Sequence, residues 1–176
     1  MARLLAVLLL CSTAAPAELD ADAYFEAGVR YLKRGLFKSA RAAFAESLVR
    51  SPGQPVPMAF LALAGAAEGR PAGETALLLR WAHARLPDGK SLRLDLASLL
   101  PSRRALDLLQ EDFRARAAKE KGDPRFDALT VLAFLEVHDG DPVAAHALDA
   151  LLEELPADPF ALALARLRPA APEPAP

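Results

Sequence analysis

The chain has 176 residues, enough for one domain or a short array of repeats, and 53% of them are hydrophobic. Aromatic residues make up only 6%. Alanine and leucine therefore supply most of the apolar content, and both favour helices over strands. The formal net charge of −2 lacks the basic excess of a nucleic-acid-binding protein. The composition predicts an all-α protein without a nucleic-acid partner.

Residues 1–17 have the three-part order of a secretory signal peptide. Arg3 supplies a basic start, Leu4–Leu10 is an unbroken apolar run, and Ala15-Pro16-Ala17 fits a cleavage site before Glu18. The apolar run is far shorter than the roughly 20 residues of a membrane-spanning helix. We therefore expect an exported, periplasmic or extracytoplasmic protein without a membrane span.

Cys11 is the one cysteine of the chain, which excludes a disulfide within it. Its place after a leucine run leaves a second possibility open, a lipid anchor on this cysteine. Leu10 stands where the lipid-attachment motif of bacteria has a small residue, which favours a cleaved signal over a lipoprotein.

Glycine and proline divide the next part of the chain into helices. The sequence predicts helices over residues 21–34, 37–50, 55–68 and from Pro71 to Leu86. Asp20 can cap the first of them, Gly35 can end it in the left-handed conformation, and Pro52 follows the second. The connections are short, so consecutive helices should form antiparallel hairpins.

The segment after Gly89 is ambiguous. Leu92, Leu94 and Leu96 alternate as in a strand, but Leu96 and Leu100 also fit one helical face. A lone strand would have no partner, which favours a short helix. A longer helix is expected from Pro101-Ser102 to Lys121, with an apolar face at Leu106, Leu109 and Phe113.

Three further helices are predicted from pairs of aspartate and proline. Asp123-Pro124 opens a helix that reaches His138, and Asp141-Pro142 opens the next one in the same way. Asp158-Pro159 opens a short last helix over residues 159–167. Residues 169–176 are rich in proline and alanine and are predicted to be disordered.

Large and small side chains alternate in a specific order across the first predicted hairpin. The residues concerned are Tyr24, Ala27, Gly28, Tyr31, Gly35, Phe37, Ala40, Phe44, Leu48 and Pro52. Gly28 allows the two helices to approach, Ala40 fills the gap opposite, and Phe44 fills the core of the hairpin. This pattern resembles a tetratricopeptide repeat of a small exported bacterial protein. Weaker matches recur at the family's period of about 34 residues.

The resemblance implies a short right-handed solenoid of stacked helical hairpins within residues 18–168. Its units would be repeats at 21–54, 55–88 and 124–157, a degenerate unit at 89–122, and a cap helix at 159–167. The segment 89–122 has no glycine between its helices. It is therefore either a degenerate repeat or a spacer pair of helices.

In this family the first helix of each pair lines a concave groove that holds a peptide or a partner helix. The candidate partner-binding residues are Phe25, Val29, Leu32, Lys33, Arg125 and Thr130. Phe25 and Val29 occupy the places of the charged carboxylate clamp of the best-known members, so an apolar or mixed groove is expected. Alternatively, both side chains pack against a neighbouring helix.

No motif for catalysis or for a bound cofactor is present. The chain lacks G-x-S-x-G, a phosphate-binding glycine loop and H-E-x-x-H, and no two of its three histidines lie one helical turn apart. We expect no cofactor and no metal. The predicted function is a non-catalytic adaptor or scaffold of the cell envelope that binds a protein or peptide. Its alternatives are a structural subunit of an envelope machine or, remotely, an enzyme with a site in 89–122.

Overall fold

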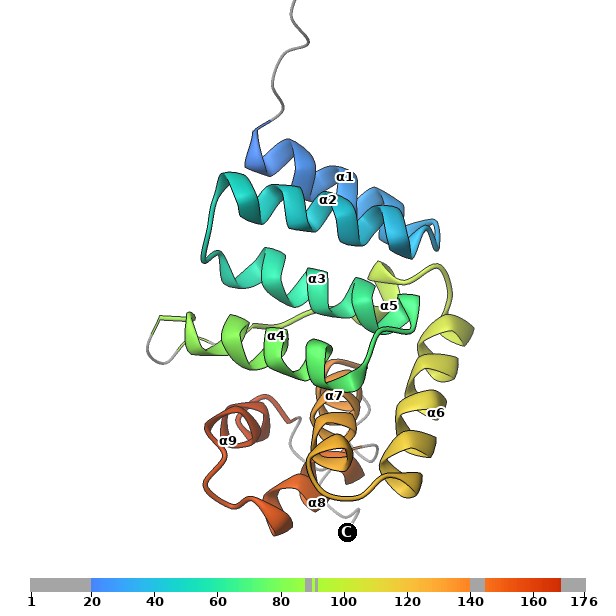
Figure 1. Ribbon diagram of the computed structural model, residues 1–176, viewed down its shortest axis with the longest axis vertical. Helices are drawn as coiled ribbons and strands as arrows, with labels where there is room; N and C mark the ends of the chain where they lie inside the picture. Colours follow the sequence, from blue (N-terminus) through green and yellow to red (C-terminus); the bar gives the residue numbers. More distant parts are fainter. Residues whose placement is uncertain (1–19, 88–89, 91, 140–144, 169–176) are drawn as a thin grey trace, which may run out of the picture.

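The computed structural model describes residues 20–87, 90, 92–139 and 145–168, and all regular secondary structure in these ranges is helical. The helices are α1 (Ala21–Lys33), α2 (Phe37–Arg50), α3 (Pro55–Glu68), α4 (Ala72–Ala84), α5 (Leu96–Leu99), α6 (Arg103–Lys119), α7 (Asp123–Asp139), α8 (His146–Glu154) and α9 (Pro159–Ala165) (Figure 1). The all-α prediction is confirmed. The predicted signal peptide, the lipid anchor at Cys11, the helix start at Asp141-Pro142 and the tail at 169–176 lie outside the described residues.

The helix ends follow the predicted chemistry at most places. The Asp20 carboxylate accepts a hydrogen bond of 2.8 Å from the backbone N–H of Ala23, and the Asp158 carboxylate accepts one from Phe160. Gly35 has a φ of +73°, which a residue with a side chain rarely adopts. Asp123 was expected to precede α7 as its cap. In the structure α7 begins at Asp123 itself.

The first four helices stack one after another as two antiparallel hairpins (Figure 1). Phe44 of α2 lies at the centre of the first hairpin with no exposed surface. Its ring centroid is 5.7 Å from that of Phe25 in α1 and 5.4 Å from that of Phe60 in α3. The predicted close approach at Gly28 is confirmed, and Phe44 is the side chain that faces it.

Two buried helical glycines should respond in opposite ways to the same substitution. A Cβ atom at Gly28 would lie 2.5 Å from Cε1 of Phe44, whereas one at Gly65 would meet no side-chain atom closer than 3.6 Å. We expect Gly28→Ala to lower the free energy of unfolding by about 1–2 kcal/mol, because the overlap outweighs the gain in helix propensity. Gly65→Ala should raise it by about 0.5–1 kcal/mol. Urea unfolding measures both, and equal effects of one sign would contradict this packing.

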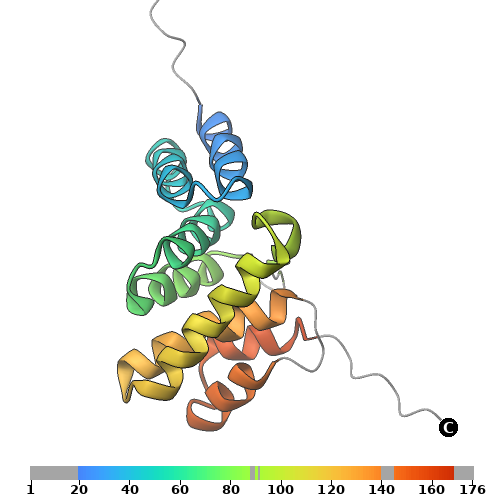
Figure 2. The same cartoon turned by 90° about the vertical axis from the view of Figure 1, so that its right-hand side faces the viewer.

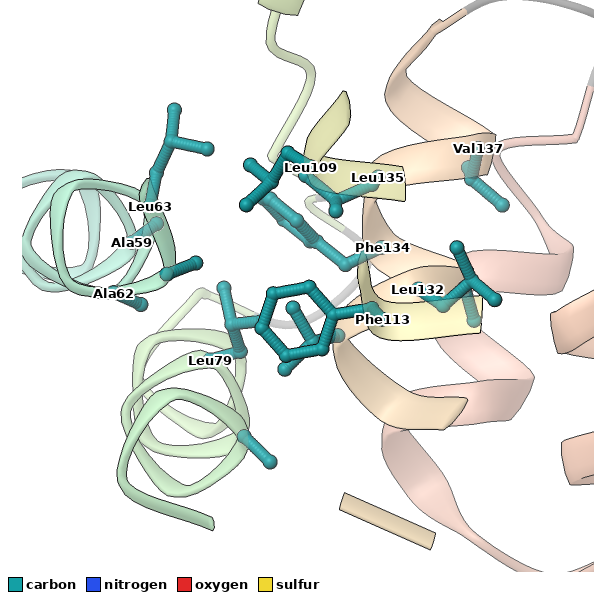
Figure 3. Packing of buried hydrophobic residues seen from close by; sticks show 14 of the residues in the cluster. Ala59, Ala62, Leu63, Leu79, Leu109, Phe113, Leu132, Phe134, Leu135 and Val137 are labelled. Carbon is teal, nitrogen blue, oxygen red and sulfur yellow. The ribbon is translucent and has the colours of Figure 1, made fainter. Parts of the chain in front are cut away.

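The second half of the chain is built around α7. All residues from Ala128 to His138 are buried, because α4, α6, α8 and α9 pack around this helix. Figure 3 shows Phe113 of α6 and Phe134 of α7 on the side that faces Leu79 of α4, so that one continuous core joins the two halves. The pairing of α7 with α8 agrees with the predicted last hairpin.

Residues 92–119 depart from the simple order of hairpins. The short helix α5 packs against α1 and α7, and α6 packs along α7. Two carboxylates of α7 with almost no exposed surface, Asp139 and Glu136, pair with Arg103 and Arg114 of α6. Both guanidinium groups are more than half exposed, yet each neutralises a buried carboxylate.

Candidate functional site

The structure places four of the predicted groove residues on α1. Leu32 has no exposed surface, so the prediction that it lines an open groove is wrong. The Phe25 ring lies 5.1 Å from the Phe60 ring in an edge-on contact, and Val29 is partly buried against the core. Of this group only Lys33 is exposed. The alternative interpretation, in which Phe25 and Val29 pack against a neighbouring helix, describes these contacts.

The two predicted groove residues of α7 belong to its polar contacts with other helices. Arg125 forms an ion pair with Glu154 of α8. Thr130 is fully buried, accepts a hydrogen bond of 2.8 Å from Arg80 of α4 and donates one to the carbonyl of Phe126. The prediction of Thr130 as a groove residue is therefore also wrong. α1 packs on α2, α3 and α5, whereas α7 packs on α4, α5, α6, α8 and α9.

The chain itself covers the end of α1. Pro101, which precedes α6, would lie 3.3 Å from a Cβ atom at Gly35, and the short helix α5 packs on α1 with Leu96 fully buried. Figures 1 and 2 show α5 beside the turn between α1 and α2. This part of α1 is therefore not open for the binding of another molecule.

A different apolar groove lies between the end of α3 and the first half of α6. We call it the α3–α6 groove. It has a volume of about 330 Å³ and is lined by Phe37, Ala66, Ala67, Glu68, Gly69, Leu100, Ala105, Leu108, Leu109 and Asp112. α6 packs along α7 and makes little contact with α3, and the groove lies between α6 and the end of α3. Leu108 keeps 49% of its surface exposed on one wall of the groove.

Both carboxylates in the groove are already neutralised within the chain. Glu68 forms an ion pair with Arg41 of α2. Asp112 lies 2.7 Å from the guanidinium group of Arg116, which also lies 5.0 Å from the centre of the Phe113 ring. The groove thus presents mainly uncharged apolar surface, which favours binding of apolar side chains over chemistry on a polar substrate.

Sequence reasoning missed Leu108 and Leu100. A signal for Leu108 was present, because Leu106, Leu109 and Phe113 already fill the apolar stripe of α6 and Leu108 falls outside it. Leu100 carried no such signal, since its position in the groove depends on how the segment before α6 folds back to α1.

A smaller, more enclosed cavity lies between α4, α7 and α9. Its volume of about 20 Å³ is enough for about one water molecule, so it cannot hold a substrate without rearrangement. His83 and His138 line it together with apolar side chains. Nδ1 of His138 lies 2.8 Å from the carbonyl oxygen of Phe134, and Nε2 lies 2.9 Å from that of Leu92. A neutral imidazole ring carries one N–H and can donate to only one of these carbonyls.

Burial lowers the pKa of both histidines below the ordinary value, although the two carbonyl contacts partly oppose this for His138. The folded protein therefore binds these protons less readily than the unfolded chain. The associated stability is fully present above about pH 6.5, the pKa of an unfolded histidine, and is lost as the pH falls below it and through the lower pKa of the folded state. We expect the free energy of unfolding to decrease more between about pH 7.5 and about pH 5 in the wild type than in His138→Gln. Urea unfolding at both pH values tests this, with the exposed His146→Gln as control; equal losses in all three proteins would contradict it.

Within the described ranges, no three His, Cys, Asp or Glu side chains gather as a metal site, and no helix is long and apolar enough to cross a membrane. The fold and the groove define an all-α protein of stacked helix pairs with an apolar surface groove. Comparisons with protein-family models, with curated protein sequences and with solved structures gave no significant match.

Proposed function

We propose that this chain is a non-catalytic protein–protein interaction scaffold of the cell envelope, which binds a protein or peptide partner in the α3–α6 groove. The observation that carries the proposal is an open apolar groove with a half-exposed leucine, Leu108, and with its carboxylates neutralised internally. Apolar surface of this kind, in a groove between two helices, favours docking of apolar side chains.

The architecture supports two tetratricopeptide-like repeats at residues 21–54 and 55–88. Gly28 faces the Phe44 ring directly, Gly35 makes the turn between the helices, and α1 to α4 pack in chain order. We propose that these four helices are the start of a short solenoid. Residues 89–122 then act as a spacer, whose helix α6 packs on α7 and so forms one wall of the groove.

The tripartite order of the N-terminal sequence, which ends at Ala17, supports the proposal that the protein is exported. Mass spectrometry of the mature protein should find Glu18 as its first residue. Retention of Met1 would contradict export by this route, and a lipidated Cys11 would replace the soluble form by an anchored one.

A photo-crosslinking amino acid tests the docking site in the cell. Leu108 and Leu162 are matched positions, since they are helical leucines that are 49% and 44% exposed, and only Leu108 lines the groove. With p-benzoylphenylalanine at position 108, we expect a covalent adduct with another protein that is missing or weaker at position 162. Equal adducts at both positions, or none at 108, would count against the proposal.

A second candidate function, a structural subunit of a larger assembly, has support from a different surface. Leu77 and Trp81 are 47% and 48% exposed and lie one turn apart on α4. A paired apolar face on the outside of a helix is typical of assembly contacts. If this function is correct, Leu77→Ser with Trp81→Ser should release the protein from a large complex in envelope extract, whereas Leu108→Glu should not.

A further inference from the structure

We infer that the partner segment of the α3–α6 groove is acidic, with one or two large apolar side chains that enter the groove and carboxylates that face the turn between α1 and α2. This inference rests on the proposed function and adds the chemistry of the partner. It follows from the position of three cations at one end of the groove and from the absence of anions for them in the described part of the chain.

The turn between α1 and α2 lies at the end of the groove. Phe37, the first residue of α2, lines the groove, and Pro101 would lie 3.3 Å from a Cβ atom at Gly35 in the turn. Leu100, the neighbour of Pro101, also lines the groove. Figure 1 shows the turn, α5 and the first turn of α6 near one another on the right-hand side of the molecule.

Three exposed cations lie in or beside this turn: Lys33 is the last residue of α1, Arg34 follows it, and Lys38 is the second residue of α2. Among the described residues no carboxylate lies within ion-pair distance of any of them, and Arg30, one turn before Arg34, already pairs with Glu26. We call these three residues, Lys33, Arg34 and Lys38, the charged corner. It contrasts with the groove, whose two carboxylates are both paired.

The helix ends strengthen the positive potential at Lys38. α2 has no acidic residue in its first turn, and its N-cap residue, Leu36, makes no side-chain hydrogen bond to the helix. The positive end of the α2 dipole therefore adds to the charge of Lys38. Lys33 and Arg34 complement the negative end of α1, which offers a structural reason for these two cations but none for Lys38.

Charge complementarity indicates which kind of partner segment binds in the α3–α6 groove. An acidic segment gains from three cations that have no carboxylate partner among the described residues, whereas a basic segment would be repelled at the same end of the groove. A membrane surface with anionic lipids would also attract the cations, and Tyr31 and Leu36 are partly exposed nearby. The hollow shape of the groove favours a peptide, because a flat lipid surface cannot fill it.

A library of random displayed peptides of about 12 residues provides the probe, selected on the purified mature protein. Peptides that bind the wild type but not Leu108→Glu should be enriched in Asp and Glu together with Leu, Phe, Ile or Trp. The matched Leu162→Glu variant should retain them. Circular dichroism of each variant checks that the helices are intact.

The charged corner is then tested with a synthetic copy of the most enriched peptide. Reversal of Lys33, Arg34 and Lys38 to Glu should weaken its binding by about tenfold or more, and salt should weaken binding to the wild type. Reversal of Lys90, Lys119 and Lys121, which are exposed elsewhere, is the matched control and should have a much smaller effect.

The possible outcomes separate the inference from the proposed function. Leu108-dependent peptides without acidic enrichment, or with affinity unchanged by reversal of the corner, would overturn the inference and leave the proposed function standing. A lack of Leu108-dependent peptides would overturn both. A third outcome concerns vesicles of phosphatidylglycerol. If they bind the wild type, compete with the peptide and no longer bind when Lys33, Arg34 and Lys38 are reversed, the inference of an acidic peptide is overturned, and the ligand of this surface is an anionic membrane.

Discussion

Replacement of Phe44 by alanine is expected to lower the free energy of unfolding by about 3–5 kcal/mol, the usual cost of removing a fully buried phenylalanine. The ring has no exposed surface, lies against Gly28 and joins Phe25 and Phe60 in a cluster of three rings. Its removal leaves a cavity between α1, α2 and α3, because the helical backbone cannot close over a ring-sized space.

Thermal unfolding monitored by circular dichroism measures this effect. For a chain of this size the midpoint should fall by about 6–20 °C. Val49→Ala on the same helix is the control, since Val49 is 71% exposed and its truncation should change stability by less than about 0.5 kcal/mol. Similar small shifts in both variants would contradict the packing of the first hairpin.

Replacement of Arg114 by leucine is expected to cost about 2–3 kcal/mol, because it leaves the buried carboxylate of Glu136 with less compensation. Oε1 of Glu136 lies 3.1 Å from the Arg114 guanidinium, and Oε2 accepts a hydrogen bond of 2.9 Å from the backbone N–H of Ala147 at the start of α8. The cost is below that of a fully enclosed ion pair, since Arg114 itself is 55% exposed.

A double-mutant cycle separates the charge from the loss of packing. Glu136→Gln keeps an oxygen that can accept from Ala147 and should cost about 1 kcal/mol on its own. In the Glu136→Gln background, Arg114→Leu should lose most of its effect, because no buried charge is left uncompensated. Additive costs, measured by urea unfolding, would show that Arg114 does not stabilise the carboxylate of Glu136.

The elements of this fold were predictable where their cause is local. Gly35 ends α1, Asp20 caps it, and Asp158-Pro159 opens α9, as the sequence indicated. Gly28 was also assigned correctly, because only a glycine permits the approach of the Phe44 ring. In each case the information lies within a few residues of the element or within one hairpin.

The site was less predictable because its contacts join distant parts of the chain. Leu32 is fully buried, and its helix α1 packs on α5, which lies more than 60 positions later in the sequence. The partners of Arg103 and Arg114 are carboxylates on α7, 36 and 22 positions away. Helical periodicity identifies a charged face, but it cannot tell which of these charges meets a buried partner.

The claim that a partner binds in the α3–α6 groove is tested most directly by an NMR titration with a peptide selected on the groove. The titration follows the methyl signals of alanine, leucine and valine. If the partner binds in the α3–α6 groove, the signals of Ala66, Ala67 and Leu108 should shift, while those of Val29 and Leu162 should stay unchanged. Shifts at Val29 with unchanged signals from Ala66, Ala67 and Leu108 would contradict the account and place the partner on α1.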